Sequence, residues 1–292
     1  MAAQCDEIIT KGGFSLQAID KVFAADQNHK EAIYTYQYDD ILGGAGNLAG
    51  GNSHILNPTF QCRYYEMPGG HMIEDNTWGG NSYGWTVPNN YLRSLFNPIV
   101  AGVSPDKRFT NYFYPDSVIG NKPTSSFYGK PLPKSSYPDN YRQYHWSVMK
   151  YRDFVKAPGN ATSYKDVIAC RYAETLLLGA EAHWRLTNDA SDPTALSYIN
   201  RVRTRAGVPA FTTIDQQTIL EESARELNFE GGRWFLLKRM GVLFTQVNLY
   251  HTFGSAKTNE AVFPMKAHMV RWPIPQDQID LMAPNFPQNT GY

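Results

Sequence analysis

The sequence predicts a mainly α-helical protein in which a helical block follows a long region of irregular, aromatic-rich loops. Apolar side chains recur at three- and four-residue spacing through most of residues 166–248, as in amphipathic helices. Residues 43–158 are instead rich in glycine, proline and aromatic residues in turn-forming combinations. Aromatic residues make up 14% of the 292-residue chain, which is long enough for one large domain. A helical scaffold with a large loop surface accounts for all three observations.

Residues 1–42 are expected to contain two short helices and one extended segment. The helices are predicted at 4–10 and 15–24, with Ser15 as the N-cap of the second. Tyrosines alternate with other side chains in residues 31–40, which predicts a strand or an extended segment.

The region 43–158 is interpreted as a functional loop surface. A long irregular stretch is uncommon in a compact domain unless it carries a function. One helix is predicted within it, at 88–97, because Pro88 suits the first helical turn. Two tyrosine-rich segments, 111–115 and 137–146, are more typical of an edge strand packed against helices than of a binding site.

The region 159–292 is expected to form a helical block and a C-terminal tail. A helix is predicted at 166–186, where small residues such as Gly179 would let a second helix approach closely. That second helix is predicted at 193–206 and is followed by Gly207. The pair has about the length of a tetratricopeptide unit. Further helices are predicted at 215–229 and 234–248, before an extended tail.

The charge balance and the isolated cysteines exclude several classes of function. There are 27 Lys and Arg residues against 27 Asp and Glu residues, without a long basic run, so no nucleic-acid partner is expected. Cys5, Cys62 and Cys170 are far apart and the seven histidines lie singly, which argues against a metal site or a disulfide framework. We expect buried thiols and no cofactor. No apolar run approaches the ~20 residues of a membrane span.

Four motifs occur in a fixed order in the second half of the chain. They are DVIACRYAETLLLGAEAHWRL with INRVRTRAGV, then ESARELNFEGGRWFLLKRMG, then RWPIPQDQID, and finally FPQNTGY. Together they resemble the C-terminal half of the SusD/RagB family, outer-membrane lipoproteins that capture glycans for a TonB-dependent transporter. GWTVPNNYLRSLF, followed by DKR, extends the resemblance upstream.

The resemblance implies a SusD-like, tetratricopeptide-type scaffold over residues 1–292, with the N-terminal part of the family architecture missing. It also implies a surface-exposed position at the outer membrane and a SusC-type transporter as partner. The start of the chain has neither a signal-peptide pattern nor, at Cys5, the context of a lipidated cysteine, so we expect it to be a portion of a longer protein. The closing motifs RWPIP and QNTGY are expected to pin the tail across the helical block.

Glu222, Glu226 and Glu230 follow one stripe of a predicted helix and allow two interpretations. A glycoside hydrolase would need two carboxyl groups about 5–9.5 Å apart on either side of a bond. Carboxylates on adjacent turns of one helix point side by side, which favours a structural role. In that role they would pair with arginines such as Arg201, Arg203 or Arg205. Ser223 and Leu236 stand where the family commonly has Arg and Asp, which predicts a thinner ion-pair network here.

The loop TWGGNSYGWTVP contains the candidate binding residues. Sugar rings present apolar faces and equatorial hydroxyls, so a glycan site combines flat aromatic rings with polar side chains. The candidates are Trp78, Tyr83 and Trp85, with Asn76, Asn81 and Asp75 beside them. The alternative is that the tryptophans fill a core beneath the loop. In that case the site would lie around Tyr112, Tyr114 and Tyr141.

These observations together predict non-catalytic binding of an oligo- or polysaccharide. Two alternatives stay open. One is a helical-repeat scaffold that binds only protein, and the other is a glycoside hydrolase.

Overall fold

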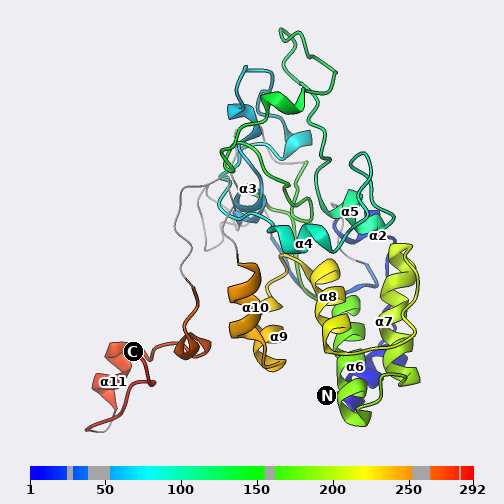
Figure 1. Ribbon diagram of the computed structural model, residues 1–292, viewed down its shortest axis with the longest axis vertical. Helices are drawn as coiled ribbons and strands as arrows, with labels where there is room; N and C mark the ends of the chain where they lie inside the picture. Colours follow the sequence, from blue (N-terminus) through cyan, green and yellow to red (C-terminus); the bar gives the residue numbers. More distant parts are fainter. Residues whose placement is uncertain (25–28, 39–52, 155–161, 252–263, 283) are drawn as a thin grey trace.

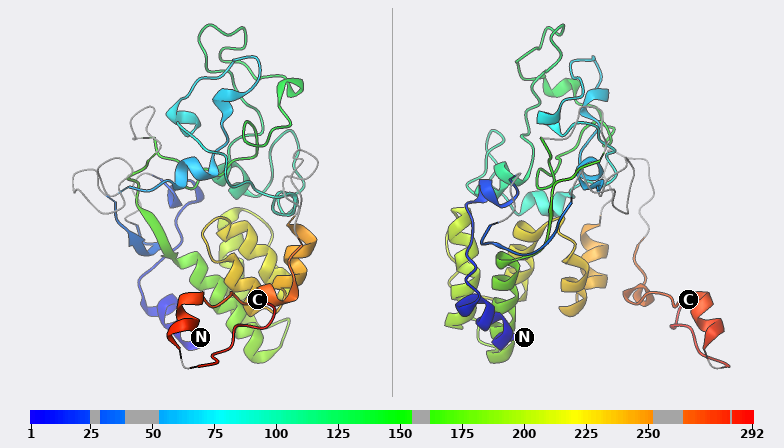
Figure 2. Two further views of the ribbon diagram at one scale, coloured as in Figure 1. Left: turned by 90° about the vertical axis from the view of Figure 1, so that its left-hand side faces the viewer. Right: turned by 180° about the vertical axis from the view of Figure 1, so that it is seen from behind.

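The computed structural model describes residues 1–24, 29–38, 53–154, 162–251, 264–282 and 284–292. Helices gather in one half of the molecule, whereas long loops with short helical turns make up the other half (Figure 1). The same division is visible from the side and from behind (Figure 2). The predicted mainly helical class is therefore confirmed. The glycine-rich stretch that begins at residue 43 lies outside the described residues as far as residue 52.

A close pair of helices forms the centre of the helical half. Helix α6 (Tyr172–Thr187) packs against α7 (Pro193–Ala206), and α1 (Ala2–Lys11) covers another side of α6. Helix α7 has the predicted bounds. The Asp192 side chain caps its first turn by accepting a hydrogen bond from a backbone amide, and Gly207, with a φ of 77°, ends it.

Gly179 allows the helices around α6 to approach closely. A Cβ atom at this position would lie 2.9 Å from the Tyr198 ring of α7 and 3.3 Å from Cβ of Cys5 in α1. The small-residue interpretation of this helix is therefore confirmed.

We expect Gly179→Ala to lower the free energy of unfolding by about 1–3 kcal/mol, because overpacking forces the neighbouring ring to shift. Helix propensity alone would raise the stability by about 0.5–1 kcal/mol. Urea unfolding of the variant and the wild type measures the difference. An equally or more stable variant would show that Tyr198 moves aside without cost.

Three further helices complete the block. They are α8 (Gln216–Leu227), α9 (Arg233–Arg239) and α10 (Leu243–Tyr250). The single helix predicted at 234–248 is wrong: the chain turns at Gly241, where φ is 73°, and starts again as α10. The principal hydrophobic core lies between α6, α7, α8 and α9, and the buried residues at its centre are Ala173, Leu176, Ile199, Val202, Ile214, Ile219 and Leu220.

A two-stranded antiparallel sheet connects the N-terminal region to the helical block. Strand β1 (Ala32–Tyr36), which was predicted, pairs with β2 (Val167–Arg171), which was expected to be helical. The extended partner β1 satisfies the backbone of β2, and α6 begins only at Tyr172. Cys170 lies on the outer face of β2 and is exposed, so only Cys5 and Cys62 are the buried thiols expected.

Short helices and turns organise the loop half. They are α2 (Ile19–Val22), α3 (Leu56–Phe60), η1 (Tyr64–Glu66), η2 (Asn76–Trp78), α4 (Asn90–Ser94), α5 (Lys107–Tyr112) and η3 (Lys134–Ser136). Helix α4 is shorter than predicted and starts with Asn89, which accepts a hydrogen bond from the backbone of Leu92, as its N-cap. Ser15 caps no helix, because α2 starts later.

The edge strand predicted from 111–115 and 137–146 is wrong. One isolated bridge joins Phe113 to Val148, and residues 107–112 form α5 instead. Tyr112 and Phe113 of these segments lie in one of two smaller cores beneath the loops, and Tyr137 and Tyr144 pack against the other. One contains Phe96, Phe109, Tyr112 and Phe113, and the other contains Tyr64, Met67, Met72 and Leu132.

The C-terminal tail contains η5 (Ala267–Val270) and α11 (Gln276–Leu281), which buries no residue. Met265 anchors its beginning in the principal core. The closing motifs bind one another: Gln288 exchanges two hydrogen bonds with the backbone of Ile274, each 2.8 Å long, and Tyr292 donates to the carbonyl of Arg271. Trp272 of the first closing motif also meets the ring of Trp234 in α9 edge to face, with ring centres 6.3 Å apart, so this motif does contact the helical block. Among the described residues, no helix combines the length and apolar character needed to cross a bilayer.

Candidate functional site

A buried ion-pair network joins the loop half to the helical half. The carboxylates of Glu222 and Glu226 in α8 have no exposed surface. Arg108 of α5 lies 2.7 Å from Glu222 and 3.1 Å from Glu226. The other cations of the network are Lys150, Arg171, Arg203, Arg205 and Arg225, and Glu31 and Glu230 are further anions.

The structural interpretation of the glutamate stripe is confirmed. Burial alone would raise the pKa of Glu226, but Arg205, Arg171 and Arg108 outweigh it and hold that pKa well below its ordinary value. One expectation was wrong: Arg201 donates to the Tyr172 hydroxyl rather than to a glutamate. The cations of the network come from distant segments, and the thinner network expected from Ser223 and Leu236 stays a prediction.

The segment around Trp85 is fixed to α3 by its backbone. The amides of Tyr83 and Trp85 donate to the carbonyls of Pro58 and Thr59 at 2.8 and 3.2 Å. Gly84 has a φ of 62°, and a Cβ atom there would lie 3.0 Å from the carbonyl oxygen of Arg142. Only glycine suits both the backbone conformation and this close approach. The loop is therefore held against the tyrosine-rich segment that follows residue 136.

Trp85 is the most exposed ring of the predicted set. Trp85 is 59% exposed to solvent. One face of its indole ring stacks on the Tyr83 ring, with ring centres 4.5 Å apart and an interplanar angle of 25°. The stack holds the indole in place and leaves a flat apolar face open to solvent.

A pocket of about 620 Å³ lies beside this ring. Its lining combines aromatic with charged and polar side chains, namely Trp85, Asn89, Asn90, Arg93, Asp116, Lys134, Tyr137, Asp139, Tyr141, Tyr144, His145, Trp146 and His251. Arg93 holds Asp116 through two hydrogen bonds of 3.0 and 2.6 Å, and its guanidinium lies 5.4 Å from the centre of the Trp146 ring. The polar wall is thus preorganised by its own contacts.

The other predicted residues do not line this pocket. Trp78 is half-buried between Tyr64 and Tyr114, with ring centres 6.0 and 5.9 Å apart. The carboxylate of Asp75 accepts hydrogen bonds from the backbone and side chain of Thr77. Asn76, Asn81 and Tyr83 do not line the pocket beside Trp85.

Sequence reasoning missed the polar wall of the pocket. From the sequence, Arg93 was predicted to lie in a helix, with no role in binding assigned to it. Tyr137 and Tyr144 were predicted to lie in a strand. Of the alternative tyrosines, Tyr112 and Tyr114 are buried, whereas Tyr141 lines the pocket. The high density of tyrosines between residues 137 and 146 was the feature of the sequence that could have predicted the polar wall of the pocket.

The fold and this site define a class: a helical scaffold whose loop half carries an aromatic surface beside a polar pocket. The chain belongs to the SusD family, whose model matches residues 24–292.

Known members of the family are similar in sequence and fold. Over 152 residues the chain is 30% identical to the starch-binding protein SusD of Bacteroides thetaiotaomicron, an alignment that covers 50% of this chain and 26% of SusD. A SusD homologue from the same species has a TM-score of 0.69 at 17% identity, over 100% of this chain and 58% of that one. Surface glycan-binding protein A of that species, solved with laminarihexaose, has a TM-score of 0.65 at 20% identity, over 99% and 58%. The chain therefore spans only part of each relative.

Proposed function

We propose that this chain binds an oligo- or polysaccharide without catalysis, on the Trp85–Tyr83 stack and in the pocket beside it. The exposed face of the fixed Trp85 indole is the observation that carries the proposal. A pyranose ring covers such a face with its C–H groups, while neighbouring polar side chains bond its hydroxyls. Arg93, Asp116 and Asp139 offer both donors and acceptors on the pocket wall.

The relatives support a glycan as the ligand. Their names include starch binding and a complex with laminarihexaose, so these two glucans are the first ligands to test. By the same family membership, we propose that the protein acts at the outer-membrane surface and passes the glycan to a SusC-type transporter.

The contacts of the glutamates argue against the glycoside hydrolase. A hydrolase requires one carboxyl group free to donate a proton and another free to attack or to activate water. Both oxygens of Glu230 are held, by Lys150 at 2.6 Å and by Arg171 at 2.6 Å, and Glu222 and Glu226 are buried among arginines. The other alternative is a scaffold that binds only protein. In that case no sugar would bind to the exposed face of Trp85.

Isothermal titration with laminarihexaose and malto-oligosaccharides, and affinity electrophoresis with a polysaccharide panel, test the function. One ring face covers roughly 80 Å² of apolar surface, about 2 kcal/mol at ~25 cal/mol/Å². Two or three such contacts, less the cost of ordering the glycan, give affinities of about millimolar to high micromolar. No reducing ends should appear. If no glycan retards the protein in affinity electrophoresis, the result would favour a scaffold that binds only protein. If the protein releases sugar and a single carboxylate substitution abolishes the release, the result would favour a glycoside hydrolase.

A further inference from the structure

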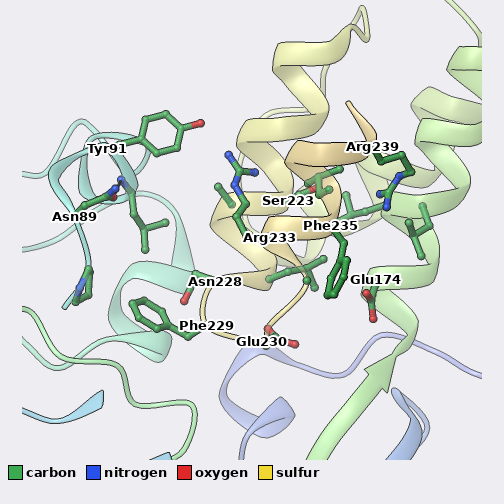
Figure 3. A pocket seen from close by; sticks show the side chains of 18 of the residues that line it. Asn89, Tyr91, Glu174, Ser223, Asn228, Phe229, Glu230, Arg233, Phe235 and Arg239 are labelled. Atoms are coloured by element: carbon green, nitrogen blue, oxygen red, sulfur yellow. Dashed lines mark hydrogen bonds between the residues drawn. The ribbon is translucent and has the colours of Figure 1, made fainter. Parts of the chain in front are cut away.

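A second pocket, of about 420 Å³, lies between α6, α8, α9 and the segment before α4 (Figure 3). It shares Val87, Pro88 and Asn89 with the pocket beside Trp85. Much of its wall is apolar, contributed by Leu177, Leu178, Leu227, Phe235 and Leu236. Its volume lies within the roughly 300–1,000 Å³ of small-molecule sites.

Glu174, in the first turn of α6, contributes a carboxylate to this pocket. Within the described part of the chain it has neither a hydrogen bond nor an ion pair. Burial, followed by the charge of Glu230, raises the pKa of Glu174, and Arg171 and Arg239 offset this effect only in part. A desolvated carboxylate without a partner is costly, and a cationic ligand would relieve that cost.

The other charged residues of the pocket are already engaged. Arg239 binds Glu181 through two hydrogen bonds of 2.8 Å. Arg233 donates to the carbonyl of Leu220 at 2.7 Å. Glu230 is held by Lys150 and Arg171, as described above. Glu174 is therefore the carboxylate of this wall that can receive a ligand cation.

Asn228 supplies a second acceptor. The residue is 8% exposed, and its amide nitrogen donates to the carbonyl of Arg225 at 2.8 Å. Its side-chain oxygen has no hydrogen-bond partner among the residues that the structure describes. Buried polar atoms without partners are rare in native proteins, which indicates that this oxygen is paired when the pocket is filled. Glu174 and Asn228 both line the cavity and lie apart from one another, with Phe235 beside Glu174 (Figure 3).

We propose that this pocket binds a linear aliphatic diamine, with one ammonium group at Glu174 and the other at Asn228. The methylene stem lies along the leucine wall, where its burial is favourable. Phe235, a residue that is 69% exposed and lines the same pocket, adds a face for the ammonium group near Glu174. An uncharged diol would leave the charge of Glu174 without an added cation.

Isothermal titration with 1,6-diaminohexane and, for comparison, 1,6-hexanediol tests the proposal. The wild type should bind the diamine at least about tenfold more tightly than the diol, since ligand charge makes the difference. Glu174→Gln, which keeps the shape of the side chain, should weaken diamine binding about tenfold or more. Glu7→Gln on α1, where the glutamate side chain is 69% exposed, is the matched control and should bind as the wild type. Absence of diamine binding, or equal loss in both variants, would overturn the proposal.

The stability of the ligand-free variant gives an independent readout. A carboxyl whose pKa is raised by folding destabilises the protein above that pKa and ceases to do so when protonated at lower pH. Glu174→Gln should therefore melt at or above the wild-type temperature at neutral pH, with a difference that shrinks as pH falls. A lower melting temperature would mean that Glu174 has a partner in solution, and the proposal would fail. Glucan binding at Trp85 should be unchanged in this variant, so the two sites fail independently.

Discussion

Glu226→Ala is expected to lower the free energy of unfolding by about 3–5 kcal/mol, the largest stability effect that we predict. The glutamate has no exposed surface and lies between Arg108, Arg171 and Arg205. Its removal leaves three buried guanidinium groups short of a counter-charge, and water cannot reach them. Urea unfolding should show a lower midpoint with an unchanged slope.

Glu221→Ala is the matched control on the same helix. Its side chain is 31% exposed and pairs with Arg225 at 3.1 Å, so its loss should cost about 1 kcal/mol or less. Glu230→Ala should resemble Glu226→Ala, because that side chain is 11% exposed and holds both Lys150 and Arg171. Folded Glu230→Ala protein should bind glucan normally. A melting temperature unchanged in Glu226→Ala would contradict the buried network.

Trp85→Ala is expected to weaken glucan binding about tenfold or more and to leave the melting temperature nearly unchanged. Trp85 is largely exposed, so on the proposed binding mode its loss should remove about 2 kcal/mol of apolar contact with the ligand but little packing within the protein. Titration of wild type and variant with the same glucan measures the effect, and thermal unfolding measures the stability.

Trp78→Ala should show the opposite pattern. Its ring packs between Tyr64 and Tyr114, so truncation should cost about 2 kcal/mol of stability by leaving a cavity. If Trp85→Ala binds as the wild type, the sugar does not use this ring, and the tyrosines on the far wall of the pocket, Tyr137, Tyr141 and Tyr144, become the candidates.

Local sequence signals determined the elements whose limits depend on their own residues. Asp192, Pro193 and Gly207 predicted the start and end of α7, because a capping carboxylate, a proline in the first turn and a left-handed glycine act within a few residues. Family motifs and helical periodicity likewise predicted the mainly helical class. The aromatic loop was recognised as a candidate surface because sugars and aromatic side chains have complementary chemistry.

Tertiary structure alone decided which aromatic rings are open. Trp78 and Trp85 lie in the same glycine-rich loop, but only Trp78 meets Tyr64 and Tyr114, which come from other parts of the chain. Val167–Arg171 fits a helical pattern equally well, and becomes a strand because β1 supplies backbone partners. The cations around Glu226 come from helices and loops that no local pattern connects to α8. Local propensities act over a few residues, whereas burial and charge pairing depend on segments that meet only when the chain folds.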